Sequence, residues 1–227
     1  MTLLIGTISE KCAVVTADGL SRTNPTTGQG LASDNFKKIF PVPALPIAFV
    51  HHGFNIIDNK TVGEFVDKYI TEHNKIIANS DILGIANDFC VYAQAAVNVV
   101  FQNPTNQGVI GFWIIGFGKN KQELELYEIC WPDKPNPYRL FGPVVLGGDG
   151  QRFLKPLPIL KQFQYSRISK FSTIFAVQYH QTLYQRAEAE QKRALEQKIV
   201  EKVIFGGHQH QLSLDKNGWK WERSPES

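Results

Sequence analysis

The order of hydrophobic patterns along the chain restricts its fold more than any single motif does. Short apolar runs rich in β-branched residues, which are typical of strands, fall at residues 3–8, 13–17, 38–41 and 47–51. Turn-forming residues at 24–30 predict a loop between them. The first fifty residues are therefore expected to be all-β.

Two helices are expected next. In residues 61–77 the apolar side chains recur at helical spacing, and Thr61 and Glu64 have the spacing of a capping box at the start of a helix. Residues 81–100 are apolar nearly all round, which predicts a helix covered on more than one side.

The second half of the chain repeats this succession. Further strands are expected at 109–117, 124–130 and 138–146, with a proline-rich loop at 132–137. Residues 151–202 then have a helical pattern, which Pro156 and Pro158 interrupt and which ends before Gly206 and Gly207. A hairpin is expected after it, with strands at 209–214 and 219–222. Helices on the outer faces of stacked antiparallel sheets would satisfy this order. We therefore expect a single α+β domain over 1–227, a four-layer α/β/β/α sandwich.

Composition narrows the classes of partner. The chain has 227 residues, 43% of them hydrophobic, and a formal charge of only +3, and its basic residues are scattered. This favours one large globular domain and gives no reason to expect a nucleic-acid partner. Three distant cysteines favour reduced thiols in the cytoplasm. The start of the sequence shows neither a signal peptide nor a spanning helix, so no membrane partner is expected.

Four segments, taken in order and with their spacing, carry a resemblance to a known family. They are residues 2–6, the strand 13–18 followed by Ser21 and Arg22, residues 32–39, and the ending from Gly206 through 219. Together they resemble proteasome beta subunits and their bacterial homologues, which are N-terminal nucleophile (Ntn) hydrolases. Residues 60–200 match only in their succession of elements.

The resemblance implies a set of site residues. Thr2 matches the family's nucleophile, Asp18 its acidic residue and Lys38 its catalytic lysine, while His52 or Gly53 matches the turn that supplies the oxyanion amide. Phe36 and Val50 are candidates for an apolar substrate pocket, although core packing is the simpler role for both. The family also implies a homo-oligomeric ring, a peptide or protein substrate, and no cofactor or metal.

The chemistry suits these residue types. A threonine hydroxyl is a weak nucleophile without a base beside it, and an N-terminal threonine has its own α-amine, with an unperturbed pKa of about 7.7–8.0. A cationic Lys38 would lower that pKa, Asp18 would hold Lys38, and a backbone N–H at His52 or Gly53 would stabilise the oxyanion. Met1 must be removed for the amine to be free.

Other features leave alternatives open. Gly148, Lys202 and Phe205 stand where the family has a serine, an aspartate and a serine that assist the nucleophile, so a catalytically inactive ring subunit is the alternative function. His208 and His210 have a spacing compatible with a metal on one strand face, but two ligands do not make a site, and surface or interface histidines are the favoured interpretation.

Overall fold

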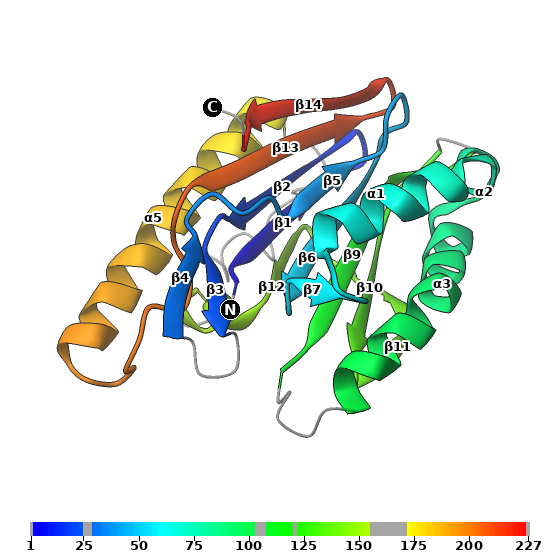
Figure 1. Cartoon of the computed structure of the whole chain (residues 1–227). Helices are drawn as coiled ribbons and strands as arrows, with labels where there is room; N and C mark the ends of the chain where they lie inside the picture. The colour runs from blue at the N-terminus through cyan, green and yellow to red at the C-terminus, as the bar shows by residue number, and fades with distance from the viewer. Residues whose placement is uncertain (1, 25–28, 103–107, 120–121, 155–171, 226–227) are drawn as a thin grey trace. The chain divides into compact units, whose positions relative to one another are not determined.

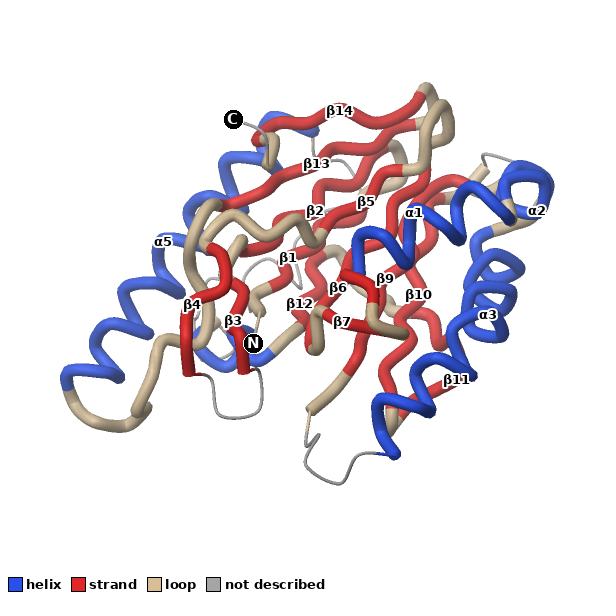
Figure 2. The backbone as a smooth tube through the Cα atoms, in the orientation of Figure 1, coloured by secondary structure: helices blue, strands red, loops and turns tan. Residues whose placement is uncertain are grey.

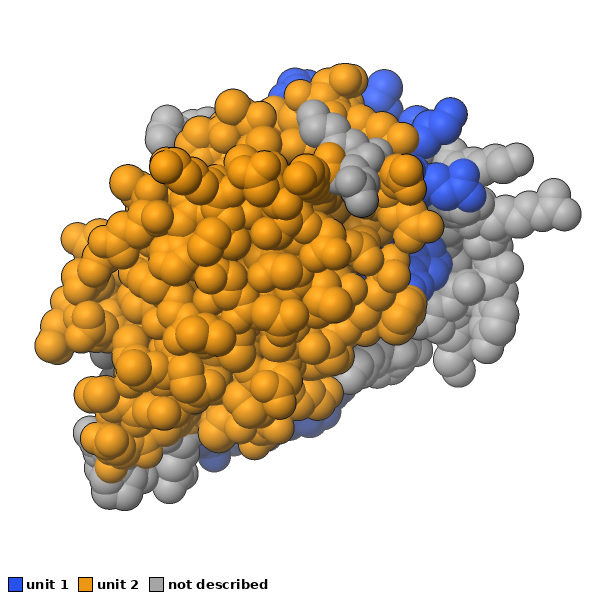
Figure 3. Space-filling view, turned by 90° about the vertical axis from the view of Figure 1, so that its right-hand side faces the viewer, with its two compact units in different colours: residues 1–36, 142–213, 220–227 blue, residues 37–141, 214–219 orange. Residues whose placement is uncertain are grey.

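The computed structural model describes residues 2–24, 29–102, 108–119, 122–154 and 172–225. Within them the chain divides into two compact units (Figure 3), residues 1–36, 142–213 and 220–227 in the first and residues 37–141 and 214–219 in the second. Each unit is described by itself.

The first unit is built on a five-stranded antiparallel sheet in the order β12-β1-β2-β13-β14. Its strands are β1 (Leu4–Ile8), β2 (Cys12–Asp18), β12 (Val144–Gly147), β13 (Gln209–Asp215) and β14 (Gly218–Arg223). The tip of the β13–β14 hairpin, residues 214–219, is assigned to the second unit. The N-terminal strand β1 lies between β2 and β12, pairing Leu4 with both Ala17 and Gly147. A short hairpin of β3 (Ser21–Asn24) and β4 (Gln29–Ser33) follows β2.

The long helix α5 (Thr173–Glu196) packs against this sheet, as Figures 1 and 2 show. The first-unit core lies between them and includes Leu3, Ile5 and Leu183, all fully buried. A 3-10 helix, η1 (Asp149–Phe153), follows β12 and adds Phe153 to the same core. The expected helix break at Pro156 and Pro158 lies outside the described residues.

The second unit has its own five-stranded antiparallel sheet, in the order β11-β10-β9-β6-β5. Its strands are β5 (Ile39–Pro41), β6 (Ile47–Gly53), β9 (Ile110–Phe117), β10 (Leu124–Trp131) and β11 (Lys134–Arg139), and a two-stranded ribbon adds β7 (Ile56–Ile57) and β8 (Lys60–Thr61). The helices are α1 (Val62–Glu72), α2 (Asn74–Asn79) and α3 (Ile82–Gln102). Phe49, Phe89 and Phe112 join sheet and helices in an aromatic core.

Helix α3 is, among the described residues, the one helix long and apolar enough to cross a membrane by length and composition. Its buried side, which includes Ile85, Phe89 and Ala93, belongs to the core that α3 shares with β9 and β10. That packing is what a core helix requires.

The expected four-layer α/β/β/α sandwich is wrong. The described residues form two units, each with one five-stranded antiparallel sheet, and the described elements are mostly strands, with only four α-helices. The order of strands and helices along the sequence is compatible with a four-layer sandwich, but it does not determine which strands pair. Strand β12, from the second half of the sequence, pairs with β1, whereas β9 pairs with β6.

Candidate active site

The buried carboxylate of Asp18 ties the N-terminal strand to the turn at Gly206. Its Oδ1 accepts a hydrogen bond from the backbone N–H of Leu3 at 2.9 Å, and its Oδ2 accepts one from the N–H of Gly206 at 3.2 Å. The Asp18 N–H in turn donates to the Leu3 carbonyl at 3.3 Å. Asp18 is fully buried, so these bonds form away from water, where charge-assisted bonds to a carboxylate are strong.

Thr2 precedes Leu3 and rests on the loop after β12. It is 1% exposed, and its carbonyl accepts a hydrogen bond from the Gly150 N–H at 2.9 Å. At Gly148, where φ is +70°, an added Cβ would lie 2.2 Å from the Thr2 carbonyl oxygen. No side chain fits at position 148 unless Thr2 moves.

Residues 34–36, which precede Lys38, are held by hydrogen bonds to Gly19, which follows Asp18, and to His208, which follows the turn at Gly206. The Asp34 carbonyl accepts a hydrogen bond from the His208 N–H at 2.6 Å, and the Phe36 N–H donates to the Gly19 carbonyl at 2.7 Å. The segments around Thr2, Asp18, Asp34 and Gly206, which are distant in sequence, therefore meet within the first unit.

Lys38 belongs to the second unit and lies directly before β5. It is 1% exposed, and its carbonyl accepts a hydrogen bond from the His51 N–H at 2.8 Å. Burial, together with the charges of His52 and Lys38, holds the pKa of His51 well below its usual range. His51 is therefore neutral, and its Nδ1 lies 3.2 Å from the Gly111 carbonyl.

His52 and Gly53 end strand β6. The His52 Nε2 is 3.4 Å from the Glu128 Oε1, which also accepts a hydrogen bond from the Trp113 Nε1 at 2.9 Å. Burial raises the pKa of Glu128, but the contacts with His52 and Trp113 outweigh it, and the net shift is downward. Gly53 has φ +101°, and an added Cβ would lie 1.9 Å from the Val109 carbonyl, so this bend requires glycine.

The predicted site residues are thus divided between the two units. Thr2, Asp18 and Phe36 lie in the first unit; Lys38, Val50, His52 and Gly53 lie in the second. Within the first unit Asp18 is bonded to the residue after Thr2. Val50 is fully buried in β6, opposite Ile39 and Trp113, and Phe36 is half-buried. The joining of Thr2 and Lys38 in one site stays a prediction.

Sequence reasoning did not single out Glu128. The signal was available, because Leu124, Leu126 and Glu128 share one face of a strand, and a carboxylate on an otherwise apolar face needs a buried partner. His52 and Trp113 are its partners here.

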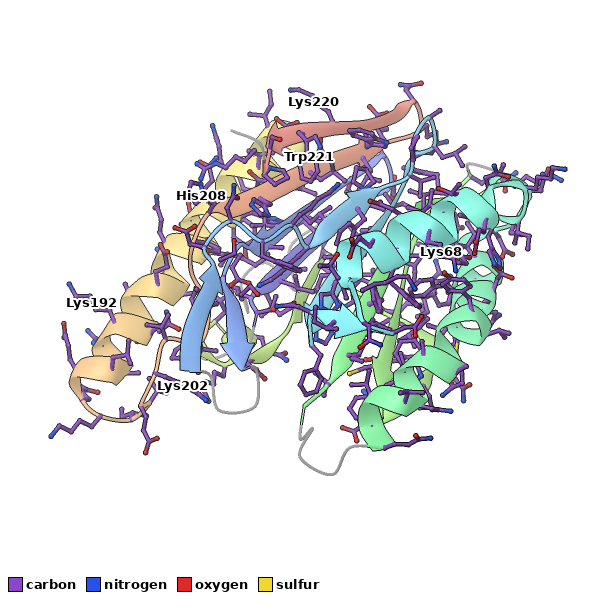
Figure 4. All side chains as sticks on the ribbon, viewed as in Figure 1. Lys68, Lys192, Lys202, His208, Lys220 and Trp221 are labelled. Atoms are coloured by element: carbon purple, nitrogen blue, oxygen red, sulfur yellow. The ribbon has the colours of Figure 1, made fainter. Side chains whose placement is uncertain are left out.

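The structure also places the other residues that the sequence analysis singled out, which are Phe205, Lys202, His208 and His210. Phe205 is fully buried between Tyr184 and Phe153, with ring centroids 5.7 and 5.9 Å away, and Lys202 is half-buried (Figure 4). His208 is exposed, but His210 is fully buried, with its Nε2 2.6 Å from the Asn35 Oδ1, so the surface assignment holds for His208 alone. Across the described part of the chain, no group of three or more His, Cys, Asp or Glu side chains is arranged to hold a metal.

Comparison with known proteins supports the fold in outline. No protein-family model matches the chain. No curated protein matches it either. Among solved structures, a Gly-1 mutant of Anbu from Hyphomicrobium sp. strain MC1 is similar with a TM-score of 0.60 and 14% sequence identity, over 98% of this chain and 85% of that one. Anbu is a bacterial proteasome-like protein related to the Ntn hydrolases, so the likeness loosely supports a proteasome-like fold.

Proposed function

We propose that this protein is a threonine-type N-terminal nucleophile amide hydrolase that cleaves peptides or proteins through Thr2 once Met1 is removed. The observation that carries the proposal is the double anchoring of the first residues, in which Asp18 binds the Leu3 N–H and Gly150 binds the Thr2 carbonyl. A nucleophile needs such fixed placement, because small misplacements cost large factors in rate.

The proposed reaction is acyl transfer followed by hydrolysis. The Thr2 hydroxyl attacks the substrate's amide carbonyl while its proton passes to the free α-amine, and the departing amine takes that proton as the C–N bond breaks. Water then cleaves the resulting ester and restores Thr2. Lys38 supplies the positive charge that lowers the pKa of the α-amine, and the backbone N–H at His52 or Gly53 receives the oxyanion.

The proposed assembly is a homo-oligomeric ring, and its support is the resemblance to proteasome beta subunits. Light scattering coupled to size exclusion is expected to give a mass that is a multiple of the 25.6 kDa chain. A particle of one chain's mass at micromolar concentration would contradict the ring.

A catalytically inactive ring subunit is the second candidate. Its specific support is the replacement of the helper residues, since the Phe205 ring is part of an apolar core and position 148 has no room for a side chain. Such a subunit keeps the fold and the oligomer and lacks the hydrolysis.

Hydrolysis of fluorogenic peptide amides distinguishes the two candidates. We expect wild type to turn over, Thr2→Ala to be inactive, and Lys38→Met to lose most of the activity. Lys37→Met is the matched control, because its side chain is exposed and lies one residue away. Equal activity in wild type and Thr2→Ala would refute the proposed nucleophile, and an inactive, folded wild type without Met1 would favour the second candidate.

A further inference from the structure

Helix α5 contains a buried polar side chain that the proposed reaction does not use. Gln191 is 6% exposed and lies in line with Ala187 and Ala194, which are buried in the same helix face. A buried carboxamide is costly unless hydrogen-bonded, so its partners indicate what it is for.

The side chain of Gln191 makes its hydrogen bonds to the segment that leads into Gly206. Its Oε1 accepts hydrogen bonds from the Ile204 N–H at 2.6 Å and the Phe205 N–H at 3.1 Å. Its Nε2 donates to the Phe205 carbonyl at 3.0 Å. Three bonds from one rigid helix fix both the position and the direction of this backbone.

The next residue connects this clamp to the N-terminal strand. The Gly206 N–H donates to Asp18 Oδ2 at 3.2 Å, and its carbonyl accepts from the Leu20 N–H at 2.9 Å. Asp18 Oδ1 in turn binds the Leu3 N–H beside Thr2. Hydrogen bonds therefore connect Gln191 to Phe205, and Asp18 to Gly206 and Leu3, and the peptide bond between Phe205 and Gly206 joins the two sets, all within the first unit.

We propose that Gln191 is a positioning residue for the nucleophile, which sets the orientation of the Asp18 carboxylate through the backbone of Ile204–Gly206 and thereby fixes the peptide unit that follows Thr2. This role rests on the proposed function of Thr2. In this proposal, position 205 contributes through its backbone N–H and carbonyl, which bind Gln191, so no side-chain hydroxyl is required there.

The test compares two variants of α5. Gln191→Met keeps the length of the side chain and removes all three hydrogen bonds, whereas Leu183→Ala weakens the packing of the same helix on the same core and leaves them intact. With a β-lactone as probe, the maximal labelling rate of Gln191→Met is expected to fall about 10- to 100-fold with unchanged half-saturation, a size typical of misplaced reacting groups. Leu183→Ala keeps its rate at temperatures where it is folded.

Gln191→Glu serves as the conservative variant, because it retains an oxygen that can accept from Ile204 and Phe205. It is expected to recover part of the rate. Equal losses of rate in Gln191→Met and Leu183→Ala would overturn the positioning role, since they would reflect general destabilisation.

Hydrogen exchange provides a readout that needs no activity. Loss of the clamp is expected to speed exchange of the Leu3 and Gly206 amides at least about tenfold, as local protection is lost, with little change in Leu183→Ala. Unchanged exchange at Leu3 in Gln191→Met would overturn the inference even in an active enzyme. If the β-lactone does not label the wild type, but Leu3 exchanges faster in Gln191→Met than in the wild type, the proposed function is refuted and the clamp is confirmed.

Discussion

At the residue scale, the two bonds and the charge of Asp18 can be separated by substitution. Asp18→Ala leaves the buried N–H of Leu3 and the half-buried N–H of Gly206 without this acceptor, which is expected to cost at least about 2 kcal/mol of stability. Asp18→Asn keeps one acceptor oxygen and the shape but removes the charge. We expect Asp18→Asn to stay more stable than Asp18→Ala in urea denaturation and yet to lose peptide hydrolysis. Full hydrolysis by folded Asp18→Asn would exclude a role for the charge.

Gly148 tests whether the absent helper hydroxyl can be restored. A Cβ there would lie 2.2 Å from the Thr2 carbonyl, so Gly148→Ser is expected to destabilise the protein and lower hydrolysis instead of raising it. Gly142→Ala is the matched control, because Gly142 also has positive φ but nothing closer than 4.0 Å. Overpacking should make Gly148→Ala roughly 1–3 kcal/mol less stable than Gly142→Ala. Equal melting temperatures would show that the loop yields freely.

At the element scale, α5 is joined to the first-unit sheet by a buried histidine. The His180 Nε2 lies 2.5 Å from the Thr7 Oγ1 on β1, and its Nδ1 lies 2.8 Å from the Thr16 Oγ1 on β2. Burial lowers the pKa of His180 to about 3. The ring is therefore neutral in the folded state, with one nitrogen donating and the other accepting.

This arrangement predicts a loss of stability in acid. The unfolded chain binds a proton at His180 near its ordinary pKa of about 6.5, whereas the folded chain does so only near 3, so stability is full above the unfolded value and falls as pH drops below it. Between pH 7 and pH 4.5 this one group should remove about 2–3 kcal/mol of unfolding free energy. Because a glutamine side chain cannot be protonated, the unfolding free energy of His180→Gln, measured by urea denaturation at both pH values, should fall less than that of the wild type. Identical losses would show that the pKa of His180 is not depressed.

Elements with a strong local pattern were predictable from the sequence. The capping box of Thr61 and Glu64 starts α1 as expected, and the closing hairpin β13–β14 forms close to the expected residues. Residues 61–77 nevertheless form two helices, α1 and α2, because the backbone leaves helical geometry at His73.

Elements whose pattern depends on their place in a sheet were missed. The proline-rich loop expected at 132–137 is wrong for residues 134–137, which belong to the edge strand β11. Pro135 and Pro137 are tolerated there because an edge strand can lack backbone donors without breaking a central ladder. Likewise the polar strands β3 and β4 have no apolar alternation to reveal them. Asp18 could be singled out by motif, but its bonds to Leu3 and Gly206, and the Gln191 clamp, depend on tertiary contacts that no local pattern encodes.

At the scale of the whole molecule, the fold is similar in outline to that of Anbu, and this similarity is compatible with both candidate functions. An active hydrolase and an inactive ring subunit would have the same sheets and the same assembly. They differ in one chemical property, which is whether the Thr2 hydroxyl, with the α-amine freed by removal of Met1, reacts with an acyl group.

Intact mass spectrometry after incubation with a β-lactone measures that property directly. The proposed mechanism predicts that wild type has lost Met1 and gains the mass of one lactone, and that Thr2→Ala gains none. Hydrolysis of peptides by a protein that retains Met1, or the same adduct on wild type and Thr2→Ala, would contradict it.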